Sequence, residues 1–322
     1  MPDEVVAMAI DRAIALTNPR LKFLDSREKT LRRPVEKCVT YLRDAISALP
    51  PPIPVSEAGW ASDPALRAFF AKAADLSAAL GRSGDLRSFF DKHADAGQAF
   101  IVLGASYHER PDRAPSLQGD AAPRDIARTV VDFSVPSARL CGHTDSELRR
   151  LLLIQSFEYM AAQAMTEISK AREGRRELED SHNLIRARLR LHQPPGSGLG
   201  NLFDVGPESA EQRRLENQLL ENERQMEERG SAREVLEHEL ECLRQALENP
   251  ENHLGFEHRK IRLSTLNVLL DEGSVEAAAD VAFTMLNLSG VPRAQYAFVI
   301  GCLERRDMPQ VKLNLADAER FL

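Results

Sequence analysis

Two long stretches of the chain carry apolar residues at heptad spacing, a pattern typical of long helices that pair along a seam. In the first stretch, which runs to about His192, the residues that recur every seven positions are Phe157, Ala164, Ala171, Leu178 and Ile185. In the second, from about Pro207 to Leu247, the seam is Leu215, Leu219, Asn222, Met226, Arg229, Arg233, Leu236, Leu240, Leu243 and Leu247. The pattern predicts an antiparallel coiled-coil hairpin over residues 144–250, with arms about 60–70 Å long.

We expect this seam to bind a protein partner or to join copies of the chain into a homo-oligomer. The seam residues proposed for that role are Leu178, Ile185, Leu219, Met226, Leu236 and Leu240. Polar residues at seam positions specify register at a cost in stability, and here they are Arg175, Asn222, Arg229 and Arg233. His182 also lies on the seam, and we interpret it as a register residue rather than a metal ligand.

The net charge of −7 resides largely in one arm of this hairpin. Residues 145–192 hold nine Lys and Arg against eight Asp and Glu, whereas residues 208–248 hold six Arg against twelve Glu. The arms, at +1 and −6, therefore attract each other. An acidic chain lacks the basic face that a general nucleic-acid coat needs, so we expect no nucleic-acid partner.

The sequence predicts a cytoplasmic protein that does not insert into membranes. The first apolar stretch, Val5–Leu16, is interrupted by Asp11 and Arg12 and lacks a basic start, unlike a secretory signal. No run reaches the ~18 uncharged apolar residues of a spanning helix. The four cysteines are widely spaced, as is typical of free thiols in a reducing compartment; they are Cys38, Cys141, Cys242 and Cys302.

The part of the chain before the hairpin is expected to form a helical region over 1–55 and an α+β module over 56–143. Residues 66–75 and 86–95 resemble each other and contain the pairs Phe69-Phe70 and Phe89-Phe90. We interpret them as a helical hairpin that buries the rings, the alternative being an exposed docking patch. Strands are predicted at 99–107 and 128–135, with a long loop or broken hairpin over 109–125.

The region after the hairpin, residues 251–322, reads as a small antiparallel β-barrel. Residues 259–271 alternate in polarity with a phase slip at Ser264-Thr265, which predicts a strand with a bulge or a bend there. Further strands are predicted at 281–288, 296–303 and 311–315. The sequence leaves open whether the strands of 99–135 join this sheet or form their own.

No catalytic motif is recognisable, and we expect no catalytic residue, metal site or bound cofactor. Cys141 and His143, or His253 and His258, lack the second ligand pair of a metal site. An enzyme of unknown class is the remaining alternative. It would require a pocket that gathers His93, His108 or His143 with carboxylates.

Residues 259–322 resemble a PilZ domain. The segment Arg262-Leu-Ser264-Thr-Leu-Asn267 occupies the place of the family's Asp/Asn-x-Ser-x-x-Gly motif, and amphipathic strands follow it. In this chain Arg262 replaces the acidic residue and Asn267 replaces the glycine. The resemblance implies a small β-barrel and, in many members, binding of cyclic di-GMP. The residues implied for such a ligand are Arg259, Lys260, Arg262, Ser264 and Asn267.

The sequence thus predicts an α+β chain, predominantly α, with N-terminal helices, a long antiparallel coiled-coil hairpin and a small C-terminal antiparallel β-barrel. The function expected from it is that of a non-enzymatic signalling or adaptor protein. Such a protein would act through protein–protein contacts and coiled-coil oligomerisation, with an atypical PilZ-like domain. The alternative is a receptor that binds cyclic di-GMP at the barrel.

Overall fold

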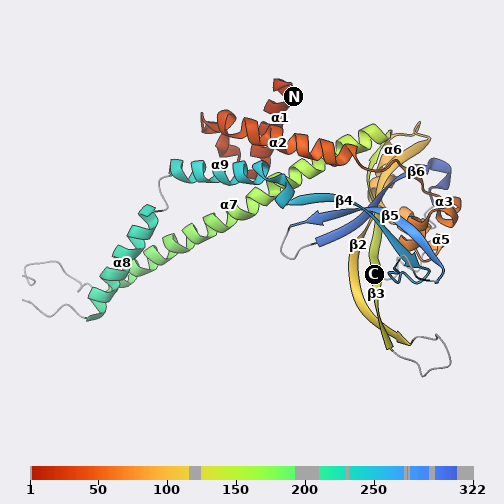
Figure 1. The fold of residues 1–322 in the computed structure, drawn as a ribbon. Helices are drawn as coiled ribbons and strands as arrows, with labels where there is room; N and C mark the ends of the chain where they lie inside the picture. Colours follow the sequence, from red (N-terminus) through yellow and green to blue (C-terminus); the bar gives the residue numbers. More distant parts are fainter. Residues whose placement is uncertain are drawn as a thin grey trace, which may run out of the picture. The chain divides into compact units, whose positions relative to one another are not determined.

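The computed structural model is a mixed α+β protein (Figure 1). It describes residues 2–115, 125–192, 210–228, 232–271, 274, 276–289 and 294–309. The chain divides into two compact units. The helical unit comprises residues 1–38 and 158–249, and the sheet unit comprises residues 39–157 and 250–322. The predicted modules 56–143 and 251–322 therefore contribute to the same unit.

The helical unit is built from helices that lie within the ranges predicted to be helical, although the second arm, predicted as one helix from about Pro207 to Leu247, is described as two. They are α1 (Asp3–Thr17), the 3-10 helix η1 (Pro19–Phe23), the first half of α2 (Arg27–Ser47), most of α7 (Asp145–His192), α8 (Ala210–Glu228) and α9 (Ala232–Glu248). In α1 the residues on one face are fully buried, as their spacing predicts, among them Val6, Ile10 and Ala13. The glycine-rich stretch of 194–200 and the seam residue Arg229 lie outside the described residues.

The sheet unit contains one sheet whose five long strands run antiparallel in the order β3-β2-β6-β5-β4. The strands are β2 (Gln98–Pro115), β3 (Asp125–Gly142), β4 (Leu254–Ser264), β5 (Ala278–Leu288) and β6 (Ala294–Glu304). The short β1 (Ile53–Pro54) pairs with β6 in parallel. Because β2 pairs with β6, the two predicted groups of strands belong to the same sheet. This resolves the choice that the sequence left open.

The strands themselves do not close into a barrel, and β3 and β4 form the two edges of the sheet. A short segment after β4 contacts both edges. Leu269 bridges to Leu263 in β4, while the N–H of Leu269 donates to Thr129 O and that of Val131 donates to Asn267 O, 2.8 and 2.9 Å away. The predicted strand at 311–315 lies outside the described residues.

Two sequence predictions about strands are wrong. Residues 109–115, expected in a long loop or a broken hairpin, continue β2 and pair with β3 as far as Pro115 opposite Asp125. Beyond Ser106, β2 no longer pairs with β6, so a proline such as Pro111 removes no N–H that the sheet needs (Figure 1). The strand expected over 259–271 ends at Ser264, where the chain makes a tight turn, so the phase slip marks the predicted bend and not a bulge.

The duplicated phenylalanines lie in the core of the sheet unit, so the alternative of an exposed patch is wrong. The helices here are α3 (Glu57–Ser62), α4 (Pro64–Phe69), α5 (Ala73–Arg82) and α6 (Gly84–Lys92). Phe69 packs against Phe133 with ring centroids 4.8 Å apart and also contacts Phe283. Phe70, Phe89 and Phe90 are likewise buried. Asp63 begins α4 by accepting hydrogen bonds from the first backbone N–H groups of the helix.

Arginines anchor two further segments of the sheet unit through backbone carbonyls. Arg149 donates to the carbonyls of Ile46, Leu49 and Pro50, and so completes the C-terminal end of α2. Arg305 begins the 3-10 helix η4 (Arg305–Asp307), and its guanidinium donates to carbonyls at the end of α6. The 3-10 helix η3 (Pro250–Asn252) leads into β4.

A close approach at Gly301 makes a specific stability prediction. A Cβ at this buried position in β6 would lie 2.4 Å from Val55 Cγ2 and 3.3 Å from Ile101 Cγ1. Because buried β-branched neighbours cannot rotate away, Gly301→Ala is expected to lower the free energy of unfolding by about 1–3 kcal/mol. Gly255→Ala in β4 is the control, since its nearest atom is 3.9 Å away. Urea unfolding of both variants measures the difference, and equal stabilities would contradict the prediction.

Candidate functional site

The basic residues predicted to bind a ligand lie on β4, and acidic neighbours neutralise them. Successive strand residues point to opposite faces, so Lys260 lies on the face opposite Arg259. Arg259 Nε donates to Glu257 Oε1 at 3.0 Å. Lys260 Nζ lies 2.8 Å from Asp280 Oδ2, and its hydrogen bond lowers the pKa of that carboxyl. The structure does not gather the basic cluster around one site.

Ser264 and Asn267 form the turn that ends β4. Ser264 Oγ accepts the N–H groups of Leu266 and Val268, both at 3.2 Å. Asn267 has a φ of 56°, in the left-handed region that glycine adopts most readily and asparagine tolerates. Its Nδ2 donates to Ala68 O at 3.0 Å, which ties the turn to α4. Both side chains therefore hold this turn in place.

A pocket of about 600 Å³ opens beside that turn. Buried Leu263 and Val281 line it, together with alanines of α4 and β5. Trp60, the only tryptophan of the chain, and Arg67 also line it. Among the described residues, Arg67 has a hydrogen bond to Ala61 O but no ion pair. The pocket thus combines an apolar lining with a cationic group. No periodic pattern in the sequence indicates that Trp60 and Arg67 line a common pocket.

Two of the histidines considered for an enzyme lie together. The rings of His93 and His143 are perpendicular, with centroids 4.3 Å apart, and Phe89 contacts both. His108 lies in β2, opposite Asp132 of β3. Burial raises the pKa of the Cys141 thiol to about 12, which keeps it protonated and a poor nucleophile. No group of three or more possible metal ligands occurs among the described residues.

The seam residues of the helical unit differ in burial. Ile185 and Leu240 are buried, whereas Leu178, Leu219 and Leu236 are half-buried. The side chain of Met226 lies outside the described part of the chain. Hydrogen bonds connect α7 to α8: Asn222 Nδ2 donates to Leu178 O at 3.3 Å, and His182 Nε2 lies 3.1 Å from Glu223 Oε1. Asn222 and His182 therefore occupy inter-helix positions, as their place on the seam suggested.

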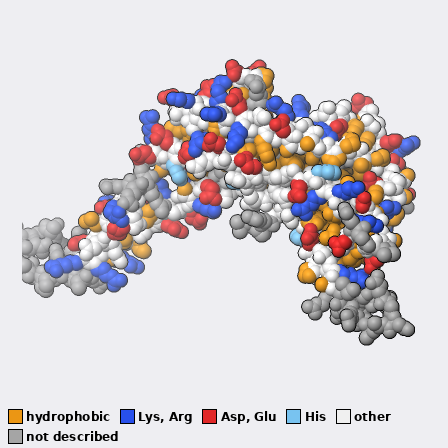
Figure 2. Space-filling view, viewed as in Figure 1, with side chains coloured by type: hydrophobic (Ala, Val, Ile, Leu, Met, Phe, Trp, Pro, Cys, Tyr) orange, Lys and Arg blue, Asp and Glu red, His pale blue; other side chains and the backbone are white. Residues whose placement is uncertain are grey.

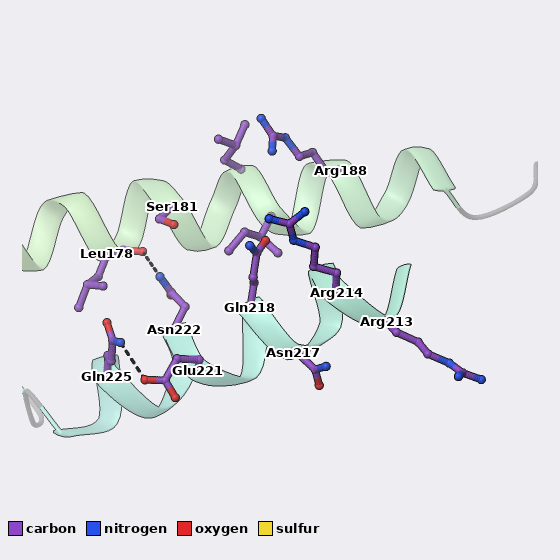
Figure 3. A pocket seen from close by; sticks show the side chains of 12 residues that line it. Leu178, Ser181, Arg188, Arg213, Arg214, Asn217, Gln218, Glu221, Asn222 and Gln225 are labelled. Carbon is purple, nitrogen blue, oxygen red and sulfur yellow. Dashed lines mark hydrogen bonds between the residues drawn. The ribbon is translucent and has the colours of Figure 1, made fainter. Parts of the chain in front are cut away.

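An open groove runs between α7 and α8 (Figure 3). It has a volume of about 760 Å³ and is lined by Leu178, Ser181, Leu184, Ile185, Arg188, Arg213, Arg214, Asn217, Gln218, Glu221, Asn222 and Gln225. Leu184 on its border is 54% exposed, and Leu220 of α8 is 70% exposed. Figure 2 shows hydrophobic and basic side chains next to each other in the region of α8. The groove therefore offers apolar, amide and cationic groups at once.

A buried carboxylate connects α7, α9 and the residue before η1. Glu239 of α9 is 3% exposed and accepts hydrogen bonds from Arg172 Nε at 2.7 Å and Arg172 Nη2 at 3.0 Å, and a further one from Asn18. Burial alone would raise the pKa of Glu239, but the hydrogen bonds from Arg172 and Asn18 reverse this and lower it. This cluster is a structural centre of the helical unit that the seam pattern did not identify.

The Glu239 cluster predicts a pH-dependent stability. Because the folded-state pKa is lowered, the ionised carboxylate contributes stability above its unfolded pKa of about 4.3 and loses it as the pH falls through the folded value. At pH 7, Glu239→Gln should lower the free energy of unfolding by roughly 2 kcal/mol. The gap between variant and wild type should shrink below about pH 4. Urea unfolding followed by circular dichroism tests this, and a gap independent of pH would refute it.

Comparisons with known proteins yield no relative: no family model, no curated protein and no solved structure matches the chain. Within the described ranges, no helix is both long and apolar enough to cross a membrane.

Proposed function

We propose that this chain is a non-enzymatic signalling or adaptor protein that acts through protein–protein contacts made by α7, α8 and α9. In this proposal the three helices form the arms of a coiled-coil hairpin. The sheet acts as an atypical PilZ-like domain, and the segment 267–269 completes the barrel by connecting its edge strands. The protein works in the cytoplasm and requires no cofactor.

The observation that carries this proposal is the groove between α7 and α8. Its borders expose Leu184, while Arg188 and Arg214 have no ion pair among the described residues. Exposed apolar surface beside unpaired charge is typical of a protein-binding surface. The hydrogen bonds from Asn222 and His182 hold α8 against α7, so the groove exists before a partner arrives.

Site-specific crosslinking tests the adaptor proposal. A p-benzoylphenylalanine placed at Ser181, in the groove, should form covalent adducts with another polypeptide when the protein is irradiated in its native cytoplasm. The same group at Lys29, an exposed position on α2, is the control and should give none. Gel shift and mass spectrometry detect the adducts. Absence of adducts at Ser181 would contradict the proposal.

The second candidate function is that of a cyclic di-GMP receptor. It is favoured by the backbone of Asn267, whose positive φ suits the glycine that the PilZ motif has at this place. The pocket beside Ser264 and Asn267 adds an indole and the guanidinium of Arg67, which could stack on a base and bind a phosphate. Against it, Arg259 and Lys260 are already ion-paired.

Trp60 makes this second candidate directly measurable. If cyclic di-GMP binds in the pocket, titration should change the fluorescence of this single tryptophan, and Arg67→Ala should weaken binding about tenfold. Calorimetry of the same titration provides an independent readout. No heat and no thermal shift at high ligand concentration would rule the receptor out.

A further inference from the structure

The face of α7 that points away from α8 carries a stripe with an apolar centre and oppositely charged ends. Its four residues, which we call the α7 stripe, are Glu177, Asp180, Leu184 and Arg188. Spacings of three and four residues place them on one face, since a helix turns about 100° per residue. All four are exposed, and Figure 3 shows Arg188 projecting from α7 on the side away from α8.

The charges of the α7 stripe are not compensated within the described chain. Neighbouring charges are paired: Arg175 with Glu179, and Arg186 with Glu223. Arg188, Glu177 and Asp180, by contrast, have no ion pair among the residues that the structure describes. The acidic end and the basic end are therefore both available to a partner with the reverse order of charges.

The groove also contains a buried acceptor without a donor. Asn222 is 6% exposed, and its Nδ2 donates to Leu178 O, but its Oδ1 has no hydrogen-bond partner. A buried acceptor without a donor is costly, so native proteins rarely retain one. This acceptor lies between α7 and α8, whereas Arg188 projects on the side of α7 away from α8, so it takes no part in the interface described next.

We propose that the α7 stripe binds the α7 stripe of a second copy of this chain, turned end for end. When the second copy is rotated by 180° about an axis perpendicular to the helix, the acidic end of each stripe faces the basic end of the other. This match is the condition for a twofold, self-complementary interface. Arg188 and Asp180 are each four residues from Leu184. The axis therefore passes at Leu184, where the two leucines bury each other, and each Arg188 meets Asp180 of the second copy.

This arrangement names the protein partner, and it rests on the proposed function of the helical arms. Exposed ion pairs contribute little affinity individually, so the charges act mainly by selecting the end-for-end orientation, and Leu184 supplies apolar burial.

A charge-reversal pair tests the orientation. Arg188→Glu and Asp180→Arg should each weaken self-association about tenfold or more, because both ends of the interface then oppose like charges. An equimolar mixture of the two variants restores attraction at both ends and should form heterodimers with wild-type affinity. Arg33→Glu, the same change at an exposed position on α2, is the control and should leave self-association unchanged. Sedimentation velocity and native mass spectrometry measure the species.

Each outcome bears on the proposal. A wild-type chain that stays monomeric up to about 100 μM overturns it. So does a mixture of the two variants that forms no heterodimer, because the orientation would then be different. If the Ser181 crosslinker captures only other proteins, the adaptor function stands and the second copy is excluded. Crosslinks from Ser181 to the same chain, together with rescue in the mixture, support the proposal.

Discussion

The pairing of β2 with β6 is the interaction on which the rest of the sheet unit depends. It joins residues 98–106 to residues 296–304, so the strands before and after the helical arms become one sheet. With β2 fixed against β6, the chain leaves the sheet from one edge, β3, and returns at the other, β4. The arms are therefore an insertion between the two edge strands. The short segment 267–269, which contacts both edges, lies directly after β4, the strand at which the chain returns to the sheet.

The elements that were best predicted from the sequence are those in which apolar residues recur at regular spacing because one face of the element packs against a neighbour. The heptads before and after residue 200 predicted helical structure where α7, α8 and α9 occur, because a helix that packs along one face must repeat its apolar residues. They indicated a single helix after residue 200, where the structure describes α8 and α9 separately. The phenylalanine pairs were rightly placed in the core. Residues 109–115 were missed because Pro111 disfavours a strand interior, and only the tertiary structure shows that this part of β2 has a free edge. The small barrel over residues 251–322 was predicted from the number of short strands. That number does not determine whether the two edge strands of a sheet pair with each other.

The candidate sites were harder to predict because charge in a sequence says nothing of its neighbours. Arg259 and Lys260 look like an anion-binding cluster until Glu257 and Asp280 are placed beside them. Asn267 was read as a departure from a motif glycine, although its backbone adopts the conformation that such a glycine provides. Conversely, Glu239 looked like one of many solvated acids of the second arm. Its buried carboxylate accepts hydrogen bonds from Arg172 and from Asn18, which is 221 residues away.

The insertion of the arms between the edge strands also constrains the order in which the protein folds. Strands β2 and β3 are synthesised before the arms, but β6, the central neighbour of β2, leaves the ribosome only after the arms, β4 and β5. The arms make contacts closer in sequence, such as Leu178 with Asn222, and these can form before β6 exists. The edge of β2 that later pairs with β6 must therefore stay without its partner strand while the arms assemble. During that interval the nascent sheet is the part of the molecule most exposed to aggregation, and most in need of chaperones.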